Sequence, residues 1–229
     1  MQQVTIIVPV KDEEVGLQYL LENFESSKIE EEFEIDFIFV IDDRTSDNSR
    51  QIATRLSKRI IDQSETYGKG AAIKQAVNKW ILNQSHFVIF LDADGSYSFN
   101  GVREIISALQ TGADVASGSR FISNNVRPKG MGWVHNFGNR TLSKISSIRN
   151  GRHISDLCTG LWGFTGESLI KIEIQSNGFD LEAEIAGEVR KRKLLHLEVP
   201  IKWSQRKGGI SKLRSIRDGL FILARIIRT

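Results

Sequence analysis

Short apolar runs alternate with amphipathic stretches through the first 120 residues of the chain. Runs rich in β-branched and aromatic residues predict strands, and the amphipathic stretches between them predict helices. The predicted strands are residues 4–8, 35–41, 60–61, 87–91 and 114–117. This alternation is typical of parallel strands joined by crossover helices, so we predict an α/β, Rossmann-like, mostly parallel sheet flanked by helices.

Capping and turn residues set the expected ends of these elements. Pro9 is expected to end the first strand because it has no N–H for the ladder, and Asp12 is expected to cap the helix that follows. The further predicted helices are residues 46–59, 71–82 and 101–109.

The second half of the chain is less regular. Residues 124–138 contain several glycines and basic residues, and they predict a mobile loop. Helices are expected over residues 139–148 and 181–189, and strands over 159–164 and 195–199. We see no linker, so we predict a single domain, with a nucleotide-sugar half (1–120), an acceptor half (121–205) and a tail (206–229).

The tail is basic and amphipathic. Residues 206–229 carry seven Lys or Arg against one acidic residue, Asp218. Its apolar residues recur at helical spacing; they are Leu213, Ile216, Leu220, Leu223 and Ile227. This pattern predicts an element that lies on an anionic membrane surface. The alternative is a helix packed on the domain or on a second copy of the chain.

Composition excludes several classes. The 229 residues, with 40% hydrophobic and 26% charged, are typical of a soluble globular protein. A net charge of +3 is too small to indicate nucleic-acid binding. The single cysteine, Cys158, excludes an internal disulfide and suits a reducing compartment. Strand-like sequence from Val4 gives no sign of a signal peptide, and no apolar run approaches the ~20 residues that span a bilayer.

Two carboxylates follow the apolar run 87–91. Asp92 and Asp94 leave the strand one residue apart, so they share a face. Because like charges so close repel each other, a cation is expected between them, and carboxylate oxygens suit Mg²⁺ or Mn²⁺. The alternative is a plain Asp-Gly turn with a solvated second Asp.

Other polar residues follow neighbouring strands, and all should meet at one edge of the sheet. They are Asp42, Asp43, Lys69, Ser119 and Arg120. This convergence favours a ligand site beyond the carboxyl ends of the strands. Arg120 and Arg140 are candidates for binding phosphate, although each, taken alone, is more typical of a solvated surface arginine. The turn at Gly68-Lys69-Gly70 is too short for a Walker A loop, and no G-x-G-x-x-G follows the first strand.

Taken in order, the motifs resemble those of family 2 glycosyltransferases with the GT-A fold, in the dolichyl- and polyprenyl-phosphate branch. The matching segments are VPVKDEE (8–14), VIDDRTSD (40–47), YGKG (67–70), LDADG (91–95), GSRF (118–121), DLCTG (156–160), FDLEAE (179–184) and residues 198–213. Relatives often have Gln two residues after the second aspartate. Here that residue is Ser96, a poorer metal ligand, so the resemblance supplies only two protein ligands.

The resemblance implies a role for each matching residue. Those expected to contact the nucleotide are Pro9, Val10, Glu13, Asp42, Lys69, Asp92 and Ala93. Asp92 and Asp94 would bind Mg²⁺ or Mn²⁺. Arg120, also expected to be catalytic together with both aspartates, would hold an acceptor phosphate with Arg140. Arg206 and Lys212 would close over the diphosphate.

The implied activity is a metal-dependent, inverting hexosyl transfer at the cytoplasmic face of a membrane, by a cytoplasmic protein bound there peripherally. The donor would be a nucleoside-diphosphate sugar of the GDP-mannose or UDP-glucose type, and the acceptor a polyprenyl or dolichyl phosphate. If the acceptor were a glycan hydroxyl, a carboxylate must deprotonate it, and Asp180, Glu182 and Glu184 are the candidates. A non-catalytic nucleotide-sugar-binding protein is a further alternative.

Overall fold

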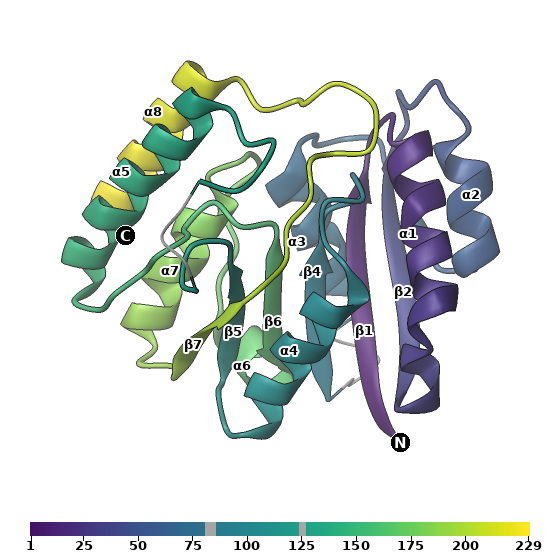
Figure 1. The fold of residues 1–229 in the computed structure, drawn as a ribbon, viewed down its shortest axis with the longest axis horizontal. Helices are drawn as coiled ribbons and strands as arrows, with labels where there is room; N and C mark the ends of the chain where they lie inside the picture. Colours follow the sequence, from purple (N-terminus) through teal and green to yellow (C-terminus); the bar gives the residue numbers. More distant parts are fainter. Residues whose placement is uncertain (81–85, 124–126) are drawn as a thin grey trace.

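A computed structural model describes residues 1–80, 86–123 and 127–229 of the chain. Within these residues one mixed sheet forms the centre of the molecule (Figure 1). Its strands are β1 (Gln2–Val10), β2 (Phe33–Asp42), β3 (Ile60–Gln63), β4 (Phe87–Leu91), β5 (Val115–Ser119), β6 (Leu161–Thr165) and β7 (His196–Pro200). Their order across the sheet is β3-β2-β1-β4-β6-β5-β7.

Parallel pairing dominates the sheet. β1 pairs parallel with β2 and β4, β2 with β3, and β5 with β7. Only β6, which lies between β4 and β5, runs antiparallel to its neighbours. The carboxyl ends of β1 to β5 therefore lie at one edge, as predicted for the α/β class.

Helices cover both faces of the sheet. They are α1 (Glu14–Ser27), α2 (Ser49–Leu56), α3 (Lys69–Trp80), α4 (Phe99–Gln110), α5 (Trp133–Asn150), α6 (Gly166–Lys171), α7 (Leu181–Lys191) and α8 (Ser215–Arg228), with a short 3₁₀ turn at Ile29–Glu31. Alternate residues of β1 point to opposite faces. Ile6 packs in the core formed with α1, α2 and α4, and Ile7 packs in the core formed with α3, α6 and α7.

Two predictions about the first loop were wrong. β1 continues through Pro9 to Val10, paired with β2. The pairing of β1 with β4 ends at Ile7. On the β4 side of Pro9 there is therefore no ladder, and the missing N–H of the proline loses no hydrogen bond there. Asp12 does not cap α1, which begins at Glu14. Instead Oδ1 of Asp12 accepts a hydrogen bond of 2.8 Å from the Ser46 backbone N–H.

Several predicted bounds also differ. α2 is shorter than the predicted 46–59, and residues 81–82 of the helix predicted over 71–82 lie outside the described residues. α5 begins at Trp133, inside the segment predicted as a loop; residues 124–126 of that segment are likewise not described. α6 was not predicted because six residues are too few to show a period.

The C-terminal helix lies alongside α5, next to α7 (Figure 1). Ile222 and Ile226 of α8 pack in a third cluster with Ile154, Leu157 and Ala186. Of the apolar residues that recur along the tail, Ile216, Leu220 and Ile227 are exposed. The helix thus packs on the domain through a different side, and contact of the exposed side with a membrane stays a prediction. Among the described residues, no helix is both long and apolar enough to cross a bilayer.

Candidate active site

Asp92, Ala93 and Asp94 follow β4 at the centre of the carboxyl edge, packed closely between two glycines. A Cβ on Gly160 would collide with the Asp92 carboxylate. A Cβ on Gly16 of α1 would collide with the Ala93 carbonyl and the Asp94 backbone. The absence of both side chains therefore makes room for the two carboxylates. The Ala93 side chain is buried in the core, so any ligand contact there would come from its main chain.

A buried cation neutralises one of the two aspartates. The Lys69 Nζ atom lies 2.7 Å from Oδ1 of Asp92 and 2.7 Å from Oε1 of Glu182. Burial would lower the pKa of Lys69, but the two carboxylates outweigh it and raise that pKa. Burial in turn raises the pKa of Asp92 and of Glu182, against the opposing effect of Lys69. Lys69, the first residue of α3, thus supplies a fixed positive charge beside Asp92.

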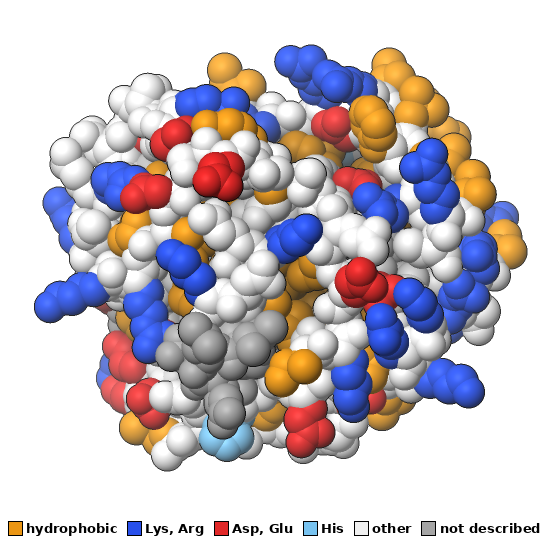
Figure 2. All heavy atoms as spheres, turned by 180° about the vertical axis from the view of Figure 1, so that it is seen from behind, with side chains coloured by type: hydrophobic (Ala, Val, Ile, Leu, Met, Phe, Trp, Pro, Cys, Tyr) orange, Lys and Arg blue, Asp and Glu red, His pale blue; other side chains and the backbone are white. Residues whose placement is uncertain are grey.

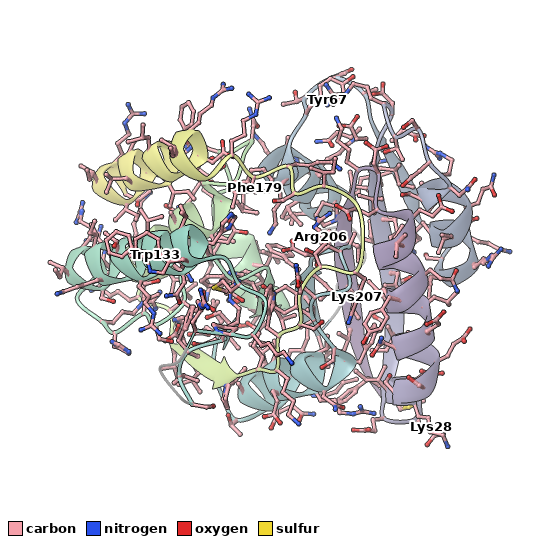
Figure 3. All side chains as sticks on the ribbon, turned by 45° about the horizontal axis from the view of Figure 1, so that its top comes forward. Lys28, Tyr67, Trp133, Phe179, Arg206 and Lys207 are labelled. Atoms are coloured by element: carbon pink, nitrogen blue, oxygen red, sulfur yellow. The ribbon has the colours of Figure 1, made fainter. Side chains whose placement is uncertain are left out.

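The segment after β7 crosses the second aspartate. The Ser204 and Lys207 N–H groups donate to the Ser96 and Asp94 carbonyls, each at 3.0 Å. Arg206 belongs to this segment and lies near the centre of the view in Figure 3, next to Lys207. Its guanidinium makes two hydrogen bonds to the Glu13 carboxylate, at 2.8 and 2.9 Å, and lies 3.5 Å from Oδ2 of Asp94.

The same segment carries a second cation, which acts on Glu13, a titratable acid just before α1. Lys212 lies six residues after Arg206 on this segment, and its positive charge acts to lower the pKa of Glu13. Burial raises the pKa of Glu13 to about 7, although Arg206 opposes the effect. Arg206 therefore lies against both Glu13 and Asp94, whereas Lys212 adds positive potential at Glu13.

Asp42 lies two strands away, at the end of β2. Its carboxylate accepts from the Arg44 side chain at 2.8 and 2.6 Å and from Lys11 at 3.1 Å. These bonds, Arg44 first, hold the pKa of Asp42 well below its usual range despite burial. Pro9 and Val10 belong to the adjacent end of β1, where Val10 is buried in the core.

The two predicted phosphate-binding arginines lie around one aromatic ring. The Arg140 Cζ is 4.8 Å from the Phe121 ring centroid and the Arg120 Cζ is 5.8 Å from it. Arg120 is almost buried and makes two 2.6 Å hydrogen bonds to Asp156. The Asn139 side chain donates to the same carboxylate at 2.7 Å. Arg120 also adds positive potential at Asp92.

The three candidate bases have different surroundings. Glu182 faces Lys69 and the site. Asp180 and Glu184 instead bind Arg225 of α8, at 2.7 and 3.0 Å. Burial would raise the pKa of Asp180, but hydrogen bonds from Ser176 and Arg225 outweigh it and lower that pKa. Within the described residues all three carboxylates are ion-paired.

The metal donor set consists of two carboxylates. Asp92 and Asp94 are both partly exposed and close enough for Asp94 to raise the pKa of Asp92. The described residues contain no group of three or more His, Cys, Asp or Glu that could hold a metal ion. Ser96 is buried, and its N–H donates to Oδ1 of Asp94 at 3.0 Å. Two hard oxygen ligands fit a divalent cation that keeps water or substrate phosphate in its other positions.

Sequence reasoning missed Asp156, Gly160, Arg44 and Arg225. Asp156 and Gly160 belong to the motif at 156–160, but nothing in their spacing shows which side chain each one serves. Arg225 lies on the tail, where it was counted only as one of several basic residues.

Comparison with known proteins shows the family of the chain. Residues 5–172 match the profile of Glycosyl transferase family 2. Glycosyltransferase AglJ of Haloferax volcanii is 32% identical over 192 residues, which cover 83% of this chain and 62% of that protein. Polyprenol monophosphomannose synthase of Mycolicibacterium smegmatis is 26% identical, over 82% of this chain and 74% of the relative. The chain thus spans less than two thirds of the first of these relatives.

Solved structures share the fold. Glucosyl-3-phosphoglycerate synthase of Mycobacterium tuberculosis, in a complex with Mn²⁺, UDP-glucose and phosphoglyceric acid, superimposes with a TM-score of 0.72. The match covers 99% of this chain and 79% of that one at 14% identity, so it concerns the fold alone. The predicted GT-A fold, with a C-terminal helix, is confirmed.

Proposed function

The chain belongs to glycosyl transferase family 2, and from this premise we propose that it moves a hexose, with inversion, from a nucleoside-diphosphate sugar to a polyprenyl or dolichyl phosphate. Relatives named polyprenol monophosphomannose synthase and dolichyl-phosphate hexose transferase support this class of acceptor. The match covers 74% and 78% of those two proteins. We therefore infer the acceptor of this chain from theirs.

One observation favours a phosphate acceptor over a hydroxyl. Asp180, Glu182 and Glu184, the candidate bases, are all ion-paired, and two arginines lie around Phe121 near Asp92. A hydroxyl acceptor needs a carboxylate able to take its proton, and a phosphate is already anionic at neutral pH. Arginines are suited to hold such a phosphate.

Asp92 and Asp94 would hold Mg²⁺ or Mn²⁺, because their paired carboxylates are the hard donors that these ions prefer. A bound cation would offset the charge that builds on the leaving diphosphate. Lys69 would keep the Asp92 carboxylate ionised and oriented toward the donor. Arg206 and Lys212 would move their positive charge from Glu13 to the diphosphate, since both lie on the segment that crosses Asp94.

Transfer can be tested with labelled nucleotide sugars and vesicles containing polyprenyl phosphate. We expect label in the organic phase, and its loss in Asp94→Ala or in excess EDTA. Arg140→Ala should reduce transfer more than tenfold, whereas Arg149→Ala, an exposed arginine at the far end of α5, should not. Label that stays wholly aqueous would favour the hydroxyl acceptor, and no turnover with any donor would favour a non-catalytic binding protein.

Peripheral membrane contact is the second part of the proposal. Large apolar side chains are exposed on the first turns of two neighbouring helices, Trp133, Val134 and Phe137 on α5 and Ile216, Leu220 and Phe221 on α8. We call these six residues the apolar edge. Arg214 and Arg217 beside it are also exposed. Figure 2 shows hydrophobic and Lys or Arg side chains together along this side of the molecule. Such a surface suits the interface of an anionic bilayer.

A further inference from the structure

The carboxylate of Asp42 is covered by two cationic side chains, Arg44 and Lys11, an arrangement that we call the cap. Its Oδ1 accepts from the Arg44 backbone N–H at 3.0 Å and from Nε at 2.8 Å. Its Oδ2 accepts from Nη2 of Arg44 at 2.6 Å and from Nζ of Lys11 at 3.1 Å. A carboxylate offers about four acceptor positions, so these four donors use them all.

An aromatic ring holds the cap in place. The Arg44 guanidinium carbon lies 3.5 Å from the centroid of the Tyr67 ring. The Tyr67 hydroxyl lies within hydrogen-bond distance of two acceptors for its single hydrogen, Oδ1 of Asp43 at 3.0 Å and the Ser64 carbonyl at 2.9 Å. The loops after β2 and β3 are thus tied together over Asp42. Nη1 of Arg44 makes no hydrogen bond within the described residues, and the Arg44 side chain is half exposed.

This cap lies where the base of a donor would lie, if the proposed function is right. β1 separates β2 from β4, so the ends of β2 and β4 are about 10 Å apart. That distance is comparable with the span of a nucleoside. A diphosphate at Asp92 and Asp94 therefore places its nucleoside across Pro9, toward Lys11, Asp42 and Arg44.

The cap changes which bases the site can bind. An uncapped carboxylate would accept hydrogen bonds from N1–H and the 2-amino group of guanine. The capped site offers N–H donors instead, from Arg44 and Lys11. Uracil presents two carbonyl acceptors and one N–H, whereas the same edge of guanine presents one carbonyl and three N–H hydrogens. N–H groups of the protein that face N–H groups of guanine leave both without an acceptor, so guanine is the poorer match.

We propose that Arg44, held on Tyr67, selects uridine-diphosphate sugars over guanosine-diphosphate sugars as donors. The proposal rests on the proposed function, because it assumes a nucleotide sugar at this edge. It assigns to Arg44 the choice of base, and to Asp42 the role of anchoring Arg44.

The test is calorimetric titration of the full chain with UDP and with GDP in the presence of Mn²⁺. We expect the wild type to bind UDP at least tenfold more tightly than GDP. Arg44→Ala uncovers Asp42, so it should weaken UDP and strengthen GDP, and thereby reduce the ratio about tenfold, the effect of one matched hydrogen bond. Arg55→Ala, which removes an exposed charge from the neighbouring α2, should keep the wild-type ratio.

Because a ratio of affinities is measured, a general loss of stability would not imitate the result. Arg44→Gln, which keeps a shorter donor, should fall between the wild type and Arg44→Ala. A wild-type preference for GDP, or an unchanged ratio in Arg44→Ala, would overturn the assignment of Arg44 alone. Failure of both nucleotides to bind would overturn the proposed function, and the base assignment with it.

Discussion

The ammonium group of Lys69 lies 2.7 Å from the carboxylate of Asp92, although the two residues are 23 positions apart in the sequence and helix α3 lies between them. Glu182 binds the same ammonium from α7, also at 2.7 Å. Three elements, α3, β4 and α7, thus meet at one buried charge. Removal of that charge would leave two carboxylates facing each other in a poorly solvated site.

Lys69→Met should therefore destabilise the fold. Breaking a fully buried pair costs 3–5 kcal/mol, but Asp92 is partly exposed, so we expect about 2–3 kcal/mol. Urea denaturation measures this loss. The double variant Lys69→Met/Glu182→Gln removes the repulsion and should recover at least half of it. Equal stabilities of the single and double variants would contradict the electrostatic account.

Gly160 makes a second prediction, because its missing side chain leaves the space that the Asp92 carboxylate fills. Gly160→Ala should move that carboxylate and weaken Mn²⁺ binding about tenfold or more, as measured by titration. Gly138→Ala is the control, since a Cβ there meets no atom within 4 Å. It should leave Mn²⁺ affinity unchanged and stabilise α5 by about 0.5–1 kcal/mol. Equal Mn²⁺ affinities in the two variants would refute the steric role.

The sequence alone could predict that four site residues meet at one edge of the sheet. They are Asp42, Lys69, Asp92 and Arg120. Each follows an apolar strand pattern or opens the helix after one, and parallel strands place such residues at the same edge. The bond between Arg120 and Asp156 could not be predicted. The two residues are 36 positions apart and no periodic element joins them, so only the folded loop before β6 brings them together.

The tail shows a different limit. Its helix carries apolar residues on more than one side, and spacing alone does not tell which side packs. The predicted side is largely exposed, whereas Ile222 and Ile226 are buried because they face α5 and α7. Which side of the helix packs depends on its contacts with the rest of the fold, and a local sequence pattern does not contain those contacts.

The apolar edge predicts vesicle binding. Trp133 and Phe137, stacked with ring centroids 5.8 Å apart, are each more than 60% exposed. Trp133→Ser/Phe137→Ser should reduce co-sedimentation with anionic vesicles several-fold at unchanged melting temperature. Ile148→Ser, at the exposed opposite end of α5, is the control and should bind like the wild type. Salt should weaken wild-type binding because Arg214 and Arg217 contribute charge.

Arg225 joins the tail to the site. It binds Asp180 and Glu184, and Glu184 in turn accepts from the backbone N–H groups of Gln175 and Ser176. The neighbouring Asn177 and Gly178 carbonyls accept from the N–H groups of residues 70 and 71, next to Lys69.

Arg225→Gln should therefore loosen the loop that carries Lys69 as well as α8. We expect a destabilisation of about 1–3 kcal/mol and faster hydrogen exchange at Gly70 and Ala71. Arg228→Gln, an exposed arginine one turn later, should change neither. If exchange rises only within α8, the connection to Lys69 is wrong.

Glu13 predicts a dependence of stability on pH. Burial raises its pKa from 4.5 to about 7, so between these values the folded state binds more protons at this group than the unfolded state does. The free energy of unfolding should then fall as pH rises from about 4.5 to 7, by roughly 3 kcal/mol at most. Urea denaturation across this range should show the slope in the wild type and in Glu25→Gln, an exposed control on α1. Glu13→Gln stays neutral, so its profile should be flatter; parallel profiles for the two variants would show that Glu13 titrates normally.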